Sequence, residues 1–257
     1  MNVKAKKHLG QHFLTDENIA KKIVEGLDFQ PYQYVLEVGP GTGVLTKYLL
    51  EKPTETYVAE IDTESIVYIK LHYQKLENKH FTGDFLKINL SDVFSGEVAV
   101  IGNFPYNISS QILFKIIENY QQIPEMVGMF QKEVAERTAA VPRTKDYGIL
   151  SVLVQAYYDV KYLFTVHENV FNPPPKVKSG VIKLTRNRKE GLEGNEILFK
   201  QIVKTGFGQR RKKLSNALKS LEIPEVLKSH AFMDKRAEEL SVEDFINFTQ
   251  DWKAAKN

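Results

Sequence analysis

The chain has 257 residues, enough for one large domain or for a large and a small one. A hydrophobic content of 42% and a charged content of 26%, with a net charge of +3, are typical of a globular protein that buries a core. The absence of cysteine and of any apolar run near the roughly 18 residues of a membrane span excludes disulfides, thiolate metal sites and transmembrane helices. We therefore expect a cytoplasmic protein with no membrane partner.

Short apolar runs alternate with helical patterns through the first two thirds of the chain. Five runs have the length and composition of buried strands: Tyr34–Val38, Thr56–Ile61, His80–Thr82, Val98–Ile101 and Met126–Phe130. Helical periodicity lies between them, at Leu45–Glu51, Glu64–Leu76 and Ile108–Tyr120. This alternation predicts a parallel sheet covered by helices on both faces.

The remainder of the chain changes character. Ser151–Tyr158 is expected to be a helix, and Tyr162–Val166 and Gly180–Thr185 a closing antiparallel pair. A charged linker at Arg186–Glu196 precedes helical patterns at Ile197–Phe207, Arg211–Leu221, Pro224–Ser229 and Val242–Lys253. The predicted fold is thus a doubly wound α/β domain over residues 1–188, followed by a small all-helical domain over residues 189–257.

A glycine-rich turn follows the first predicted strand. Its glycines, Gly39, Gly41 and Gly43, permit tight backbone angles and the close approach of a ligand, although a loop that needs positive φ angles explains them equally well. Glu60 stands at the end of the next strand, where a carboxylate can accept hydrogen bonds from ribose hydroxyls. The two features together indicate a nucleoside cofactor.

The spacing of the turn favours one cofactor over another. Gly-x-Gly-x-Gly differs from the dinucleotide pattern Gly-x-Gly-x-x-Gly, and Pro40 removes an amide that could have held a phosphate. Both features favour S-adenosylmethionine, which has no phosphate. Asp84, after the third strand, could accept from the adenine amine, or it could simply cap a helix.

The tetrapeptide Asn103-Phe104-Pro105-Tyr106 follows the fourth strand, at the sheet edge where α/β proteins bind ligands. The lone pair of an adenine N6 amine is delocalised into the ring, and accepting hydrogen bonds from its N–H groups frees that pair. The Asn103 side-chain oxygen and the Phe104 carbonyl could accept these bonds. Pro105 holds the turn, and Tyr106 offers a stacking face for a base taken out of its helix. Methyl transfer of this kind needs no metal.

These motifs resemble the KsgA-type ribosomal RNA adenine dimethyltransferases along essentially the whole chain. The similar segments are Lys7–Leu14, Glu37–Gly43, Glu60, Asp84, Asn103–Tyr106, Gln131–Arg137 and Phe171–Ser179. The resemblance implies a seven-stranded, Rossmann-like methyltransferase sheet, S-adenosylmethionine as cofactor, and dimethylation of two adjacent adenosines near the 3′ end of small-subunit rRNA. It also implies a small-subunit rRNA or pre-30S-type partner, and we expect a monomer.

The resemblance further assigns roles to single residues. Cofactor contacts are expected from His12, Leu14, Gly39, Gly41, Glu60, Asp84 and Asn103. Tyr106 and Phe171 are expected to sandwich the target base. His12 stands where many members of the family have Asn, and both residue types can donate a hydrogen bond.

Thirteen Lys or Arg residues against three Glu between Phe171 and Ser220 give a local charge excess of +10. We hypothesise that the run Arg210-Arg211-Lys212-Lys213, at the start of a predicted helix, binds rRNA phosphates, because cations there oppose the helix dipole. A solvated basic face is the alternative.

Three other functions stay open at this point. They are a large-subunit rRNA adenine methyltransferase, a ribosome-assembly or transcription factor without turnover, and a nicotinamide-dependent oxidoreductase. The segment Thr205–Leu214 favours a small-subunit target by resemblance, while the glycine spacing and the tetrapeptide argue against the oxidoreductase.

Overall fold

The computed structural model describes residues 3–256, and the contacts within it divide the chain into two compact units. The sheet unit contains the residues up to Glu136 together with Asp159–Arg186. The helical unit contains Arg137–Tyr158 and the residues from Asn187 onward. The predicted division between residues 188 and 189 therefore differs from the observed one in its treatment of Arg137–Tyr158.

This segment groups with the helical unit because of the side chains that it buries there. Tyr147 is fully buried, its hydroxyl donates to the Leu240 carbonyl at 2.9 Å, and its ring lies 5.9 Å from that of Phe207. The order of residues along the chain does not reveal this grouping, because Tyr147 forms these contacts with residues at least sixty positions later.

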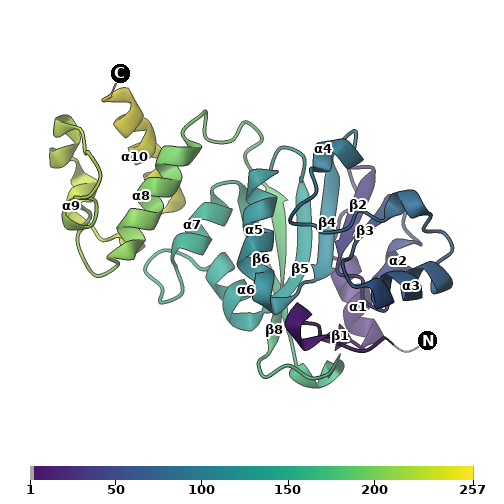
Figure 1. Cartoon of the computed structure of the whole chain (residues 1–257). Coiled ribbons are helices and arrows are strands. Elements are labelled where there is room, and N and C mark those ends of the chain that lie inside the picture. Colours follow the sequence, from purple (N-terminus) through teal and green to yellow (C-terminus); the bar gives the residue numbers. More distant parts are fainter. Residues whose placement is uncertain (1–2, 257) are drawn as a thin grey trace. The chain divides into compact units, whose positions relative to one another are not determined.

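A six-stranded sheet with the order β3-β2-β4-β5-β8-β6 forms the centre of the sheet unit (Figure 1). Strands β3, β2, β4 and β5 are parallel, and β8 runs antiparallel to β5. The strands are β2 (Tyr34–Val38), β3 (Glu55–Ala59), β4 (Val98–Asn103), β5 (Glu125–Gln131), β6 (Tyr158–Val166) and β8 (Ser179–Arg186). The parallel sheet predicted from the apolar runs is confirmed.

The third predicted strand is reduced to one residue pair. Phe81 forms a single parallel bridge to Val58 of β3, and the Thr82 amide donates to the Val58 carbonyl at 3.0 Å. Gly83, with φ of +79°, then turns the chain away. This bridge occupies a seventh strand position beyond β3.

Both faces of the sheet are covered. On one face, Val35, Ala99 and Val127 belong to a core cluster with residues of the helices α1 and α2. Leu36 and Val100 stand at alternate positions of the same strands, so they point to the other face, and they are also fully buried. The helices of this part of the chain are α1 (Glu17–Val24), α2 (Thr46–Leu49), α3 (Thr63–His72), α4 (Leu90–Val93), α5 (Ser109–Glu118) and α6 (Lys132–Ala139), with the 3₁₀ helices η1 (Lys7–Leu9), η2 (Asn78–His80), η3 (Tyr106–Ile108) and η4 (Glu168–Val170).

The N-terminal segment, residues 6–14, is attached to a loop that is distant in sequence. Strand β1 (Phe13–Leu14) pairs antiparallel with β7 (Phe171–Asn172), so that Leu14 stands opposite Phe171. Both of these side chains are buried in the same core cluster. The pairing fixes the N-terminal segment to the sheet unit.

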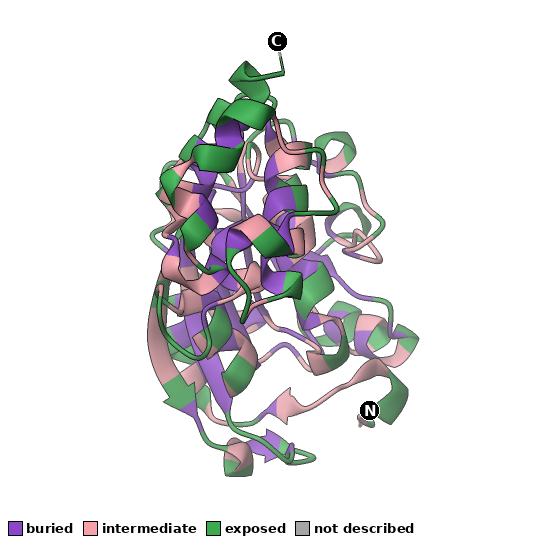
Figure 2. Cartoon of the chain, turned by 90° about the vertical axis from the view of Figure 1, so that its left-hand side faces the viewer, coloured by how far each residue is buried: buried purple, intermediate pink, exposed green. Residues whose placement is uncertain are grey.

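The helical unit consists of α7 (Ile149–Gln155), α8 (Glu196–Gly208), α9 (Leu214–Ala217), α10 (Val242–Ala254) and the 3₁₀ helices η5 (Glu225–Ser229), η6 (Ala231–Asp234) and η7 (Ala237–Glu239). Buried and exposed residues alternate along its helices (Figure 2). The helix predicted at Arg211–Leu221 is shorter than expected, because Lys213 has an extended backbone and bridges to Arg236. No helix within residues 3–256 is long and apolar enough to span a bilayer.

Candidate active site

The glycine turn lies between β2 and α2, and two of its glycines have separate reasons to be glycine. Gly39 has φ of +71°, and a Cβ built there would meet nothing within 4 Å, so its Cα faces open space. Gly41 has φ of +55°, and a Cβ there would lie 2.8 Å from the ring of Phe13. The turn therefore allows a ligand to approach at Gly39 and allows the N-terminal segment to pack at Gly41.

Glu60 follows β3, and backbone amides hold its carboxylate. One oxygen accepts from the amides of Ile61 and Asp62 at 2.8 and 2.9 Å, and the other lies 3.4 Å from the Gly41 amide. Burial raises the pKa of the Glu60 carboxyl above its usual range, while the three amide hydrogen bonds oppose that rise. Within residues 3–256 this long contact is the one hydrogen bond to the second oxygen, which can therefore accept from a ligand.

Asp62 connects the same edge of the sheet to the N-terminal segment. Its carboxylate forms an ion pair with Lys6, accepts from the Gln11 side chain at 3.2 Å and accepts from the Ser65 hydroxyl at 3.0 Å. Burial alone would raise the pKa of Asp62, but these hydrogen bonds hold it below its usual range. Asp62 is therefore charged and anchors the segment.

Glu37, on β2 just before the turn, is a buried acid. Its carboxyl accepts a hydrogen bond from the Thr46 hydroxyl at 2.6 Å. Burial raises the pKa of Glu37 to about 8, a rise that the Thr46 hydrogen bond opposes and the Glu60 carboxylate increases. Glu37 is consequently mostly neutral at pH 7.

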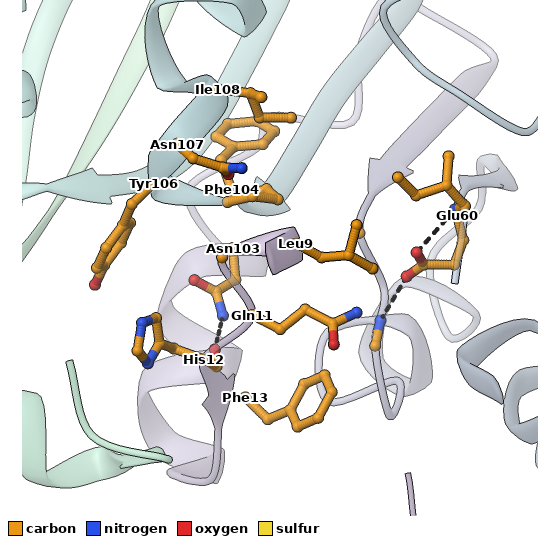
Figure 3. Close-up of a pocket in the computed structure, with 15 residues that line it drawn as sticks. Leu9, Gln11, His12, Phe13, Glu60, Asn103, Phe104, Tyr106, Asn107 and Ile108 are labelled. Atoms are coloured by element: carbon orange, nitrogen blue, oxygen red, sulfur yellow. Dashed lines mark hydrogen bonds between the residues drawn. The ribbon is translucent and has the colours of Figure 1, made fainter. Parts of the chain in front are cut away.

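Asn103 ends β4, and its side-chain amide has a defined orientation. The amide nitrogen donates to the backbone carbonyl of His12 at 2.8 Å (Figure 3). Since the nitrogen is engaged in this way, the oxygen is directed to the side on which Tyr106 lies. Within residues 3–256 no donor reaches that oxygen or the carbonyl of Phe104.

The rest of the tetrapeptide is held by packing and by one hydroxyl contact. The Phe104 ring is buried, 4.8 Å from that of Phe130, and its amide donates to the Met129 carbonyl at 3.1 Å. Pro105 precedes η3, with φ of −58°. The hydroxyl of Tyr106 lies 2.5 Å from that of Ser179 on β8.

These features surround one cleft that is open to solvent and has a cavity volume of about 120 Å³. The residues that line the cleft are Leu9, Gly10, Gln11, His12, Phe13, Gly39, Gly41, Glu60, Ile61, Asn103, Phe104, Pro105, Tyr106, Asn107 and Ile108. In Figure 3, Asn103 lies between Tyr106 on one side and Glu60 on the other.

Three of the residues expected in the site do not line this cleft. Leu14 and Phe171 are 3% and 4% exposed and belong to the core, because their strands β1 and β7 pair directly. Asp84 accepts from the Leu86 amide at 3.0 Å and pairs with Lys87 at 3.4 Å, which is the role of a local cap. The expectation that Phe171 offers a ring face to the base therefore differs from what the structure shows.

The four basic residues of the C-terminal run lie before α9, and the last of them, Lys213, is the N-cap of that helix, so three of the four lie outside the helix. Arg210 donates to Glu238 at 2.6 Å and to the carbonyls of residues 144 and 145. Lys213 pairs with Asp234 at 2.8 Å. Arg211 and Lys212 are exposed, so they differ from Arg210 in what they can bind.

Sequence reasoning missed several residues of the cleft. Gln11 and Phe13 lie in the similar segment Lys7–Leu14 but have no predicted role, and Ile61 ends the predicted strand Thr56–Ile61. Ile61 is 56% exposed despite its apolar side chain. The available signal was an apolar residue directly after the carboxylate that is predicted to bind the ligand.

A family model described as ribosomal RNA adenine dimethylase matches residues 2–253. The chain belongs to this family. The resemblance stated from the motifs is confirmed.

Among its relatives is the ribosomal RNA small subunit methyltransferase A of Flavobacterium johnsoniae, 59% identical over 96% of this chain and 95% of the relative. The protein of the same name from Cytophaga hutchinsonii is 56% identical over 96% of each chain. Both relatives therefore align with nearly the whole of this chain.

Two solved structures are similar over nearly the whole chain. A dimethyladenosine transferase from Plasmodium falciparum has a TM-score of 0.83 at 25% identity and covers 95% of this chain and 98% of its own. The 23S rRNA methyltransferase ErmE has a TM-score of 0.71 at 25% identity and covers 94% and 99%. The predicted Rossmann-like methyltransferase fold with a helical C-terminal part is confirmed.

The raised pKa of Glu37 predicts a pH-dependent stability. The folded state holds the Glu37 proton more tightly than the unfolded state, in which a glutamate titrates near 4.5. This contribution is complete below pH 4.5 and is lost as the pH rises through about 8. Relative to Glu37→Gln, which stays neutral, the wild type should lose roughly 3–5 kcal/mol of unfolding free energy between pH 5 and 9.

Urea unfolding at a series of pH values measures this difference. Glu118→Gln, at an exposed glutamate of α5, is the matched control and should follow the wild type. Parallel stability curves for wild type and Glu37→Gln would show that Glu37 is charged in the folded protein.

Proposed function

We propose that this chain transfers methyl groups from S-adenosylmethionine to the N6 amines of two adjacent adenosines near the 3′ end of small-subunit rRNA, giving N6,N6-dimethyladenosine. The observation that carries the proposal is the orientation of the Asn103 amide, whose nitrogen is held by the His12 carbonyl at 2.8 Å. The names of the relatives with 59% and 56% identity support the small subunit as the source of the substrate.

The residues of the cleft fit the proposed cofactor. The open space at Gly39 admits a ligand to the backbone, and the Glu60 carboxylate is fixed beside it by two short amide hydrogen bonds. Glu60 would hold the ribose hydroxyls, and the exposed side chain of Ile61 would pack on the adenine. When bound, S-adenosylmethionine supplies an electrophilic methyl group on a sulfonium.

The target amine would lie between two acceptors at the end of β4. An amine that donates to the Asn103 oxygen and to the Phe104 carbonyl places its lone pair away from both, so it can point at the incoming methyl group. Tyr106 offers the ring that holds the extruded base. Positioning and local electrostatics then carry the reaction, because none of these groups has to form a covalent bond.

The helical unit is proposed to help bind rRNA. Of its basic run, Arg211 and Lys212 are exposed, whereas Arg210 is engaged with Glu238. Similarity to ErmE, a 23S rRNA methyltransferase, leaves a large-subunit target as the second candidate. Mass spectrometry of rRNA after incubation of the purified chain with unmethylated small or large subunits decides between the two.

Glu60→Ala should weaken binding of S-adenosylmethionine by about 1.5–3 kcal/mol, the usual cost of losing hydrogen bonds to a charged group. Isothermal titration measures the affinity, with Glu118→Ala as an exposed glutamate control that should bind like the wild type. Unchanged affinity in Glu60→Ala, with an unchanged melting temperature, would show that Glu60 does not contact the cofactor.

Asn103→Ala should slow the methyl-transfer step by about 100-fold or more, the size of effect seen when one preorganised hydrogen-bonding group is removed from an active site. RNA affinity should change far less. Single-turnover kinetics at saturating cofactor separate the two quantities, and Asn89→Ala, at a loop asparagine, is the control. Normal chemistry with weaker RNA binding would show that Asn103 serves binding instead.

The double variant Arg211→Gln/Lys212→Gln should weaken rRNA binding and reduce the steepness of log affinity against log salt by about 1.4–1.8, as expected for two lost phosphate contacts. Cofactor affinity should not change. Lys22→Gln/Lys256→Gln carries the same change of net charge at exposed lysines elsewhere and should keep the wild-type slope. Filter binding across a salt series measures the slope. Equal slopes for both variants would favour a solvated basic face.

A further inference from the structure

The third glycine of the turn, Gly43, packs against a tyrosine that directly follows α3. Gly43 has φ of +81°, and a Cβ built there would overlap the ring of Tyr73, 2.6 Å from its hydroxyl oxygen. Gly39, by contrast, faces open space. Gly43 therefore makes room for another part of the same chain and not for a ligand.

The Tyr73 hydroxyl reaches the backbone of the turn. It donates to the Gly43 carbonyl at 2.9 Å and also lies 3.3 Å from the Thr42 carbonyl. Burial raises the pKa of the Tyr73 hydroxyl, so it keeps its proton at neutral pH and remains a donor. Within residues 3–256, no other side chain donates to a backbone carbonyl of residues 39–43. One side chain from thirty positions later thus holds the turn through its carbonyls.

The composition of the turn explains why it needs such a contact. Gly39, Gly41 and Gly43 all have positive φ angles, and glycine gives a backbone more freedom than any other residue. A turn that left this conformation would displace the open space at Gly39. It would also displace the Gly41 amide, which lies 3.4 Å from the Glu60 carboxylate. Contacts with other segments must therefore keep the turn in place.

We propose that Tyr73 is a positioning residue, whose hydroxyl holds the glycine turn in the conformation that accepts S-adenosylmethionine before the cofactor arrives. Tyr73 is not among the residues that line the cleft, so it acts through the turn. When only a fraction of the molecules has a binding-competent turn, the apparent dissociation constant rises in inverse proportion to that fraction. This inference rests on the proposed function, which supplies the cofactor.

The first test is isothermal titration of Tyr73→Phe with S-adenosylmethionine. This substitution keeps the ring beside Gly43 and removes only the hydroxyl. Affinity should fall about three- to tenfold, the range that one hydrogen bond to a carbonyl corresponds to. The KM for the cofactor should rise by the same factor, while kcat at saturating cofactor should stay within about twofold of the wild type, because the bound turn has the same conformation.

Tyr48→Phe is the matched control. Tyr48 lies on α2, is half-buried like Tyr73, and its hydroxyl donates to Glu17 instead of to the turn. This variant loses one tyrosine hydrogen bond close to the turn in sequence, and it should bind the cofactor like the wild type. Thermal melts of both variants check their folding.

A second measurement needs no cofactor. The Gly43 amide donates to the Pro40 carbonyl at 2.8 Å within the turn, so its hydrogen exchange reports on local opening. In the ligand-free chain this amide should exchange about three- to tenfold faster in Tyr73→Phe than in the wild type. Tyr48→Phe should keep the wild-type rate.

Three outcomes would overturn the proposal. Cofactor affinity of Tyr73→Phe within twofold of the wild type, even with a lower melting temperature, would show that the hydroxyl only stabilises the fold. Unchanged exchange of the Gly43 amide would show that the turn does not depend on it. A fall in kcat as large as the rise in KM would assign Tyr73 to the chemical step. A wild-type chain that binds no S-adenosylmethionine would overturn the proposed function itself, and this inference with it, whatever the exchange rates are.

Discussion

The hydrogen bond between the Asn103 amide and the His12 carbonyl, 2.8 Å long and 91 residues apart in sequence, is the constraint on which the active site depends. A side-chain amide has a donor end and an acceptor end of nearly equal shape. Only the acceptor end can receive the N–H groups of an adenine amine, so the donor end must be engaged elsewhere. The N-terminal segment does this, and it is itself fixed by the β1–β7 pairing and by the Lys6–Asp62 ion pair.

Three carboxyl groups crowd the ends of β2 and β3, and each avoids repulsion in its own way. Glu37 is buried and forms no ion pair with any residue of 3–256, so the proton stays on its carboxyl near neutral pH. Asp62 stays charged because Lys6 pairs with it. Glu60 receives backbone amides, which stabilise a charge without adding a competing side chain. Of these three acids Glu60 is the one that lines the cleft, so its carboxyl group is the one that a ligand there would meet.

The sequence predicted well whatever depends on local pattern. Buried strands such as Val98–Ile101, the glycine turn and the carboxylate after β3 follow from residue type and spacing, and the structure has each of them in place. Contacts between segments that lie far apart in the sequence could not be predicted. The burial of Phe171 follows from its pairing opposite Leu14, and the attachment of Arg137–Tyr158 to the helical unit follows from packing around Tyr147. Neither pairing leaves a periodic signal in the chain.

Neighbouring residues of a motif can also differ in what they contact, and the residue type does not reveal the difference. Arg210 is engaged with Glu238, while Arg211 beside it is exposed, although both carry the same guanidinium. His12 shows the same difference within one residue. Its backbone carbonyl orients the Asn103 amide, while its side-chain ring lies 5.4 Å from that of Tyr106. A backbone carbonyl can form this hydrogen bond whatever side chain the residue carries, so the residue type at this position does not reveal the contact.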